Sequence, residues 1–210
     1  MLSSLPFCLI VKTWIITGGI GTGKSTFAKC LSRHLGECGI AFSADAAVHE
    51  AYEKSEVRRE IAQRLELIFD DQEPGDAFRR KVRAAVLETP EHRLLIEGIL
   101  HPLVWEAYGK AVKRGGREGR KVLVAEVPLY YETGDAVAAD CVITVAASRA
   151  TQLHRLQSDR ALDARTSEDL LMMQMPLVQK IEHADFVIWN DGTLGCLEEQ
   201  ALLLLRQSQP

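Results

Sequence analysis

A glycine-rich segment followed by lysine and serine carries the clearest chemistry in this sequence of 210 residues. It reads Gly18-Gly-Ile-Gly-Thr-Gly-Lys24-Ser25-Thr26 and fits the phosphate-binding pattern G-x-x-x-x-G-K-[ST]. Backbone N–H groups of such a loop surround an anion, and the helix that follows adds partial positive charge. The Lys24 ammonium is expected to reach the β- and γ-phosphates, and the Ser25 hydroxyl to bind Mg²⁺. The segment predicts a nucleoside triphosphate, ATP, as phosphate donor, with its contacts at Gly19, Ile20, Gly21, Thr22, Gly23, Lys24, Ser25 and Thr26.

Two carboxylates follow predicted strands. Asp45 comes just after a short apolar run at 40–42 and opens a helical pattern, and Glu126 ends the apolar run 121–126. In open parallel α/β sheets, ligands bind at the carboxyl ends of strands, so Asp45 is expected near the phosphates. Asp45 is then either a catalytic group or a helix N-cap, and its position fits both readings. Glu126 resembles a Walker B acid, which orients Mg²⁺ directly or through a water molecule.

The elements that must position these residues alternate between strand and helix. Strands are predicted at 12–17, 40–42, 121–126, 141–145 and 186–189, with a helix from the glycine-rich loop to about Leu35 and another over 194–205. This alternation predicts an α/β fold, a parallel sheet flanked by helices and joined by right-handed crossovers.

Two further stretches are predicted to be helical. Residues 56–119 show apolar residues every three or four positions, including Ile68, and Pro102 is expected to kink or break the last helix beside His101. A flexible basic loop over 113–119 is expected to close this region. The second stretch is 149–181, where the Met172-Met173 pair is interpreted first as core packing.

The cations Arg79, Arg80, Lys81 and Arg83 cluster on one predicted helix. Such a cluster is usually a solvated face, and a multiply phosphorylated substrate would also require one. His101, before Pro102, either faces a pocket or packs at the bend.

Composition excludes several classes of protein. Apolar residues make up 47% of the chain and charged residues 26%, and the net charge of −4 disfavours a nucleic-acid surface. The five cysteines show no C-x-x-C spacing, which indicates neither a zinc site nor a disulfide framework and fits a cytoplasmic protein. No membrane segment is expected, and residues 1–10 lack the features of a signal peptide. We expect residues 1–10 to be peripheral, with the natural start near Val11.

Taken in order, these segments resemble the dephospho-CoA kinase family over nearly the whole chain from about Lys12. The residues that carry the resemblance, besides the glycine-rich loop, are Ala44-Asp45, Arg79, His101-Pro102-Leu103, Val127-Pro128-Leu129-x-x-Glu132, Gln174-x-Pro176-x-x-x-Lys180, Ala184-Asp185 and Asn190. The family transfers the γ-phosphate of ATP to the 3′-hydroxyl of dephospho-CoA. The resemblance implies a P-loop kinase core with a five-stranded parallel sheet at 1–45, 120–148 and 184–210, a helical CoA-substrate lobe at 46–119 and a helical lid at 149–183.

The resemblance also implies roles for particular residues. Asp45 becomes the candidate base, and an arginine of the lid, Arg155, Arg160 or Arg165, would stabilise the transferring charge. Lys180 and Asn190 would lie near the adenine of ATP. The residues expected to bind the acceptor, besides Asp45, are His49, Arg79, His101, Pro128, Leu129 and Glu132. Glu132 would either line the wall of the acceptor pocket or form an ion pair with a basic residue. The protein is expected to be a monomer or a weak homo-oligomer with dephospho-CoA as its small-molecule partner.

Three residues depart from the family pattern. Ser43 stands where the family often has Asp, which weakens a metal role there and makes Glu126 the acid to test first. His49 stands where many members have Arg, and the lid has the order Asp159-Arg160 instead of Arg-Asp. The alternatives are another small-metabolite or nucleoside kinase of the same fold and, from a different class, a nucleotide-dependent switch or assembly ATPase.

Overall fold

The computed structural model describes residues 11–89, 91–133 and 137–208. The expectations about residues 1–10 lie outside this part of the chain. The sequence Thr89-Pro90-Glu91 also predicts a helix start, and Pro90 lies outside the described residues as well. The chain divides into two compact units, which we treat separately. The first unit comprises residues 1–42 and 111–210, and the second comprises residues 43–110.

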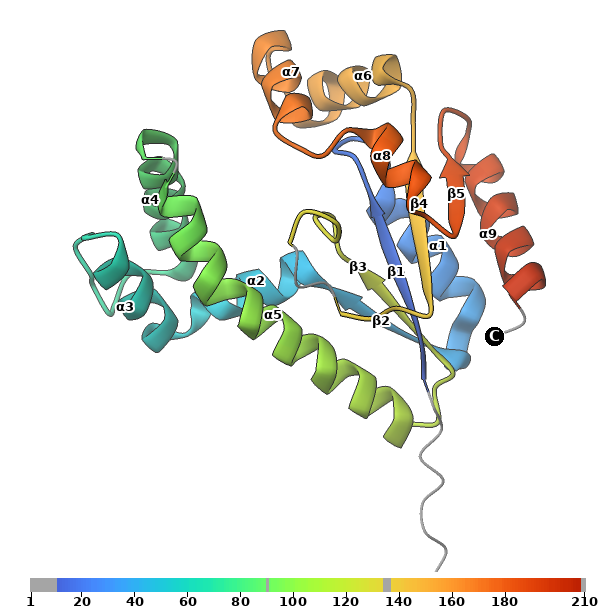
Figure 1. The fold of residues 1–210 in the computed structure, drawn as a ribbon, viewed down its shortest axis with the longest axis horizontal. Helices are drawn as coiled ribbons and strands as arrows, with labels where there is room; N and C mark the ends of the chain where they lie inside the picture. The colour runs from blue at the N-terminus through green and yellow to red at the C-terminus, as the bar shows by residue number, and fades with distance from the viewer. Residues whose placement is uncertain (1–10, 90, 134–136, 209–210) are drawn as a thin grey trace, which may run out of the picture. The chain divides into compact units, whose positions relative to one another are not determined.

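A parallel sheet forms the centre of the first unit (Figure 1). It is five-stranded, with the order β2-β3-β1-β4-β5. β1 lies parallel to β3 on one side and to β4 on the other, and β4 lies parallel to β5. The strands are β1 (Lys12–Gly18), β2 (Gly39–Ser43), β3 (Val122–Glu126), β4 (Cys141–Ala146) and β5 (Phe186–Trp189). The predicted α/β class is confirmed, because buried apolar residues on every central strand require helices on both faces.

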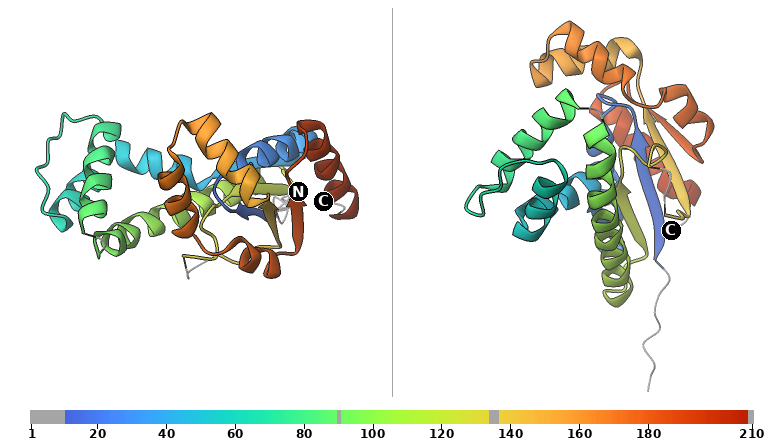
Figure 2. Two further views of the ribbon diagram at one scale, coloured as in Figure 1. Left: turned by 90° about the horizontal axis from the view of Figure 1, so that it is seen from above. Right: turned by 60° about the vertical axis from the view of Figure 1, so that its left-hand side comes forward.

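Helices cover both faces of this sheet (Figures 1 and 2). α1 (Lys24–Leu35) and α9 (Leu194–Ser208) pack together on one face, and α8 (Leu177–Glu182) packs on β1 and β4 from the other. A short 3₁₀ turn, η1 (Gly36–Cys38), links α1 to β2. α6 (Arg149–Arg160) and α7 (Ala164–Met172) lie beyond the carboxyl ends of the strands. Among the described residues, no helix combines the length and apolarity that crossing a bilayer requires.

The second unit consists of helices and the segments that join them. It contains α2 (Ala44–Glu53), α3 (Ser55–Arg64), α4 (Gly75–Glu88) and the first part of α5 (Glu91–Arg117). Ile61 and Phe78 are fully buried in its core. The prediction that Ile68 belongs to this core is wrong: its side chain is 85% exposed, because the chain leaves the helix after Arg64.

The long helix α5 overturns two expectations. It continues through Pro102 without a break, since Ile99 and Val104 on either side of the proline are both buried and hold the helix in place. It also continues to Arg117, so the flexible loop expected at 113–119 is absent. Gly115 explains the difference, because a Cβ there would lie 3.2 Å from Ile40 and 3.4 Å from Val11. The glycine therefore allows the helix to approach the sheet and does not mark a turn.

The expectation that the Met172-Met173 pair packs in the core is wrong. The side chains of Met172 and Met173 are 77% and 63% exposed, so they are not part of the core. Periodicity within 149–181 predicted the helices but could not show which face each one buries, because that depends on contacts distant in sequence.

Candidate active site

The glycine-rich loop joins the carboxyl end of β1 to the start of α1, as predicted. Two of its glycines are required by their surroundings. Gly18 has φ +138°, and a Cβ there would lie 2.1 Å from the carbonyl oxygen of Val145 on β4. Gly23 has φ +89°, and its Cβ would lie 2.3 Å from the amide nitrogen of Asn190. Other residue types would distort both positions, so neighbouring strand ends hold the loop tightly.

Lys24 and Ser25, at the end of the loop, both make polar contacts. The Lys24 ammonium is nearly buried and donates a hydrogen bond of 2.8 Å to the carbonyl oxygen of Gly19. The Ser25 hydroxyl donates to Oε1 of Glu126, at the end of β3, over 2.5 Å. β3 is the direct neighbour of β1, with Ile16 opposite Glu126, so the sheet register brings this acid to the loop.

A magnesium ion suits this pair of residues. A hydroxyl and a carboxylate are hard oxygen ligands of the kind that Mg²⁺ prefers, and they lie within hydrogen-bonding distance of each other. Within residues 11–89, 91–133 and 137–208, no group of three or more His, Cys, Asp or Glu side chains is placed to hold a metal. The remaining ligands would therefore come from phosphate oxygens and water, as is usual for Mg²⁺ at nucleotide sites.

Arg155 is the candidate arginine that lies at the loop. From α6 it donates to the carbonyl oxygen of Gly21 at 3.2 Å and to that of Asn190 at 2.9 Å. Asn190 in turn donates from its buried amide to the carbonyl oxygen of Thr22 at 2.8 Å. The other two candidates, Arg160 and Arg165, are exposed side chains further along the same segment.

Lys180 and Glu132 form a buried ion pair in the first unit. The Lys180 ammonium is fully buried, lies 2.8 Å from Oε1 of Glu132 and donates to the carbonyl oxygen of Pro128 at 3.0 Å. That carbonyl also accepts a bond of 3.1 Å from the Thr17 hydroxyl on β1. The same Glu132 oxygen accepts the backbone N–H of Met175. The Lys180 ammonium thus has two partners, the Glu132 carboxylate and the Pro128 carbonyl oxygen. Leu129, which follows Pro128 in sequence, is half-buried.

The remaining candidates belong to the second unit. Asp45 is an exposed residue in the first turn of α2, and Ser43 caps that helix by accepting a bond from the backbone N–H of Ala46. Asp45 is therefore not the N-cap, which removes the simpler of its two interpretations. His49 lies 3.5 Å from Asp76 through its Nδ1 atom, and His101 is half-buried in α5.

The basic cluster lies around a cavity within the second unit. Its volume is about 630 Å³, and its lining combines arginines with apolar side chains: Val48, Tyr52, Asp76, Arg79, Arg80, Val82, Arg83, Val86 and Ile96. Burial raises the pKa of the Tyr52 hydroxyl, while the nearby Arg79 guanidinium lowers it by a smaller amount. Cations over an apolar floor suit a phosphorylated group attached to an organic body.

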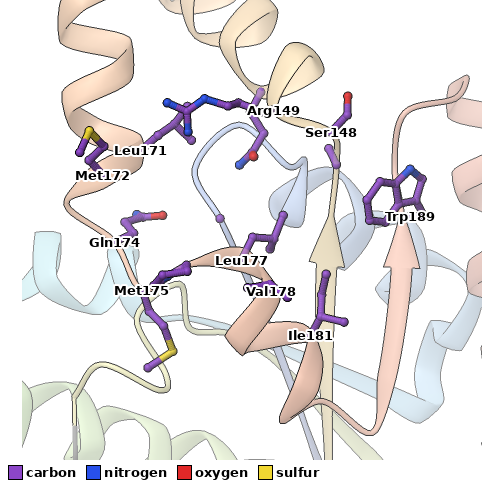
Figure 3. A pocket seen from close by; sticks show the side chains of 14 residues that line it. Ser148, Arg149, Leu171, Met172, Gln174, Met175, Leu177, Val178, Ile181 and Trp189 are labelled. Carbon is purple, nitrogen blue, oxygen red and sulfur yellow. The ribbon is translucent and has the colours of Figure 1, made fainter.

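A second cavity, of about 670 Å³, lies beside the P-loop in the first unit (Figure 3). Gly19 lines it, together with the ends of β4 and β5 and the segment before α8. Two glutamines on its wall, Gln152 and Gln174, both bind the backbone of Ile20. The sequence alone gave Gln152 no role, because a glutamine on a polar helix is usually exposed, and Gln174 stood only as part of the family pattern.

The parallel sheet and the P-loop after its first strand identify the fold as that of a P-loop kinase. A sequence model of the dephospho-CoA kinase family matches residues 13–195. The chain belongs to the dephospho-CoA kinase family.

Individual relatives agree with this assignment. The chain is 35% identical over 193 residues to a dephospho-CoA kinase from Chlorobaculum tepidum, covering 88% of this chain and 89% of the relative. The crystal structure of TT1252 from Thermus thermophilus has a TM-score of 0.75 and 27% identity, covering 94% of this chain and 97% of that one. A dephospho-CoA kinase from Campylobacter jejuni has a TM-score of 0.60 at 20% identity, with 94% and 97% covered, and so shares the fold.

Proposed function

We propose that this chain transfers the γ-phosphate of ATP to the 3′-hydroxyl of dephospho-CoA, giving coenzyme A. The observation that carries this proposal is the family match over residues 13–195. The contacts of Lys24 with Gly19 and of Ser25 with Glu126 support it. Phosphoryl transfer requires little covalent chemistry from a protein, so positioning and charge neutralisation account for most of the rate.

The donor side of the reaction belongs to the P-loop. Lys24 would leave the carbonyl of Gly19 for the β- and γ-phosphates, which offer a full negative charge in place of a dipole. Ser25 and Glu126 would hold Mg²⁺ directly or through a water molecule, and the ion would neutralise charge that develops on the phosphate oxygens. Arg155 donates a hydrogen bond to the loop at Gly21 and is our candidate for stabilising the transferring group.

Asp45 is our candidate for the group that acts on the acceptor. It follows the carboxyl end of β2 by two residues, and its carboxylate is not used for capping α2. In a loose transition state the hydroxyl keeps its proton until late, so Asp45 would first orient the hydroxyl and then accept the proton. Arg79, together with Arg80 and Arg83, would bind phosphates of the acceptor in the cavity of the second unit.

An acceptor panel tests the proposal. Release of ADP is measured with Mg²⁺ and dephospho-CoA, shikimate, gluconate or nucleosides as acceptor. Dephospho-CoA is expected to give the highest kcat/KM. Activity confined to another acceptor would instead favour a different small-metabolite kinase, and ATP turnover without any acceptor would favour a switch or assembly ATPase.

A further inference from the structure

Both backbone groups of Ile20, at the tip of the P-loop, are held by glutamine side chains. Gln152 on α6 donates from Nε2 to the carbonyl oxygen of Ile20 at 2.6 Å. Gln174, between α7 and α8, accepts the N–H of Ile20 at Oε1 over 2.8 Å. A glutamine amide carries both a donor and an acceptor, so Gln152 can donate to the Ile20 carbonyl and Gln174 can accept from the Ile20 N–H. The two side chains come from opposite ends of the segment 149–183.

The glycines beside Ile20 make room for the first of these contacts. A Cβ on Gly19 would lie 2.7 Å from Nε2 of Gln152. Gly21 has φ +74°, and its Cβ would lie 3.0 Å from the backbone oxygen of Gln152. The Gln152 side chain is also buried, with 5% of its surface exposed. α6 therefore packs directly on the loop tip, and a residue larger than glycine at position 19 would displace Gln152.

A backbone hydrogen bond of the next residue, Met175, fixes the position of Gln174. The residue after it, Met175, donates its backbone N–H to Glu132 at 3.2 Å, and Glu132 is paired with the fully buried Lys180. Figure 3 shows Gln174 on the segment between α7 and α8, with its amide extended toward the ribbon of the P-loop. The contact of Met175 with Glu132 does not involve the P-loop. It therefore fixes the backbone next to Gln174 independently of the bond between Gln174 and Ile20.

We propose that Gln152 and Gln174 are positioning residues that fix the tip of the P-loop for the triphosphate. This inference rests on the proposed function, since it concerns the same ATP site. A loop whose N–H groups are already arranged loses less conformational entropy when the phosphates bind. Removing either glutamine leaves one of the two backbone groups of Ile20 without its side-chain partner, and the loop must then be ordered at the expense of binding energy.

The magnitude follows from the value of one hydrogen bond. A net contribution of about 1 kcal/mol corresponds to roughly fivefold in a dissociation constant, so Gln174→Met and Gln152→Met should each weaken ATP binding about three- to tenfold. The double variant should lose less than the product of the two factors. Both side chains hold the backbone of one residue, Ile20, and once that residue moves the second hydrogen bond has less to stabilise.

The experiment measures Mg²⁺–ATP affinity by calorimetry without acceptor, for the wild type, both single variants and the double variant. Gln157→Met on α6 and Gln179→Met on α8 are matched controls, because both side chains are exposed and neither lines the cavity. Melting temperature without nucleotide and KM for dephospho-CoA are recorded alongside. We expect the controls and the KM for dephospho-CoA to stay at wild-type values, which a general loss of structure would not allow.

Unchanged ATP affinity in both single variants would overturn the proposal. Tighter binding would also overturn it, since Gln174 would then compete with phosphate for the N–H of Ile20. Fully multiplicative effects in the double variant would contradict the idea that both glutamines act through Ile20. If Gln152→Met does not fold, the half-buried Gln174→Met decides the question alone. Failure of the wild type to phosphorylate dephospho-CoA would defeat the proposed function and leave this comparison of ATP affinities intact.

Discussion

The buried ion pair between Lys180 and Glu132 allows a sharp test, the substitution Lys180→Met. Methionine fills a similar volume but removes the charge, which leaves the Glu132 carboxylate inside the protein with only the N–H of Met175 as partner. The second carboxylate oxygen, Oε2, is buried and has no hydrogen-bond partner among the described residues. Breaking such a pair typically costs about 3 to 5 kcal/mol in the free energy of unfolding. For a protein of this size, that loss corresponds to a fall of roughly 6 to 20 °C in Tm.

The assay is urea unfolding followed by circular dichroism, together with thermal melting, both without nucleotide. Adding Glu132→Gln to Lys180→Met should recover at least half of the loss, because a neutral amide still accepts the N–H of Met175 without leaving a buried charge. Lys110→Met is the matched control. Its ion pair with Glu106 is equally short at 2.6 Å, but the two side chains are 71% and 59% exposed. We expect no measurable change in Tm for that variant.

One result would refute this reasoning. If Lys180→Met unfolds like the wild type without nucleotide and loses only ATP affinity, Lys180 acts on the nucleotide, as its place in the family pattern first suggested. A loss of stability that Glu132→Gln fails to reduce would show that the packing of the lysine stem matters more than its charge.

Four further substitutions have definite expected outcomes. Lys24→Ala should lower kcat/KM at least about a hundredfold by removing a charge from the phosphates, with little change in circular dichroism. Asp45→Asn should lower kcat about 10²- to 10⁴-fold and leave ATP affinity nearly intact, and an equal loss of affinity would point to a structural or metal role. Glu126→Gln should raise the Mg²⁺ concentration for half-maximal activity about tenfold, measured by titration at saturating ATP. Burial raises the pKa of the Cys141 thiol from 9.0 to about 11, so the folded state keeps a proton that the unfolded state loses, and stability falls as pH rises through this window. Wild-type protein should therefore lose on the order of 2 kcal/mol more than Cys141→Ala between pH 9 and 11 in urea unfolding, and equal losses would contradict the assignment.

The fold and the loop could be predicted from the sequence because their signals are local. The apolar run ending at Glu126 indicates a strand, and the glycines around Lys24 indicate a phosphate-binding loop. The alternation of strand and helix then allows few topologies. The expected loop at 113–119 is wrong because glycine is typical of turns, whereas Gly115 lies inside α5 and allows its close contact with Val11 and Ile40. Only the distant partner distinguishes these two uses of glycine.

The roles of polar residues in the candidate site depend on partners far along the chain. Gln152 is 132 positions from Ile20, and Gln174 is 154 positions away, so neither spacing nor periodicity could pair them. Lys180 lies on α8, whereas its ion-pair partner Glu132 follows β3, so the spacing of residues could not have paired the two. The helix cap at Ser43 is a local feature that the Ser-Ala-Asp-Ala sequence itself indicates, because serine is a favoured N-cap residue.

The identity of the product tests the central claim most directly. The protein is incubated with ATP, Mg²⁺ and dephospho-CoA, and the product is analysed by mass spectrometry and by phosphorus–proton correlation in nuclear magnetic resonance. We predict one added phosphate, coupled to the proton at the 3′ position of the ribose, with ADP formed in equal amount. A phosphate at any other position, or ADP formed without a phosphorylated acceptor, would contradict the account.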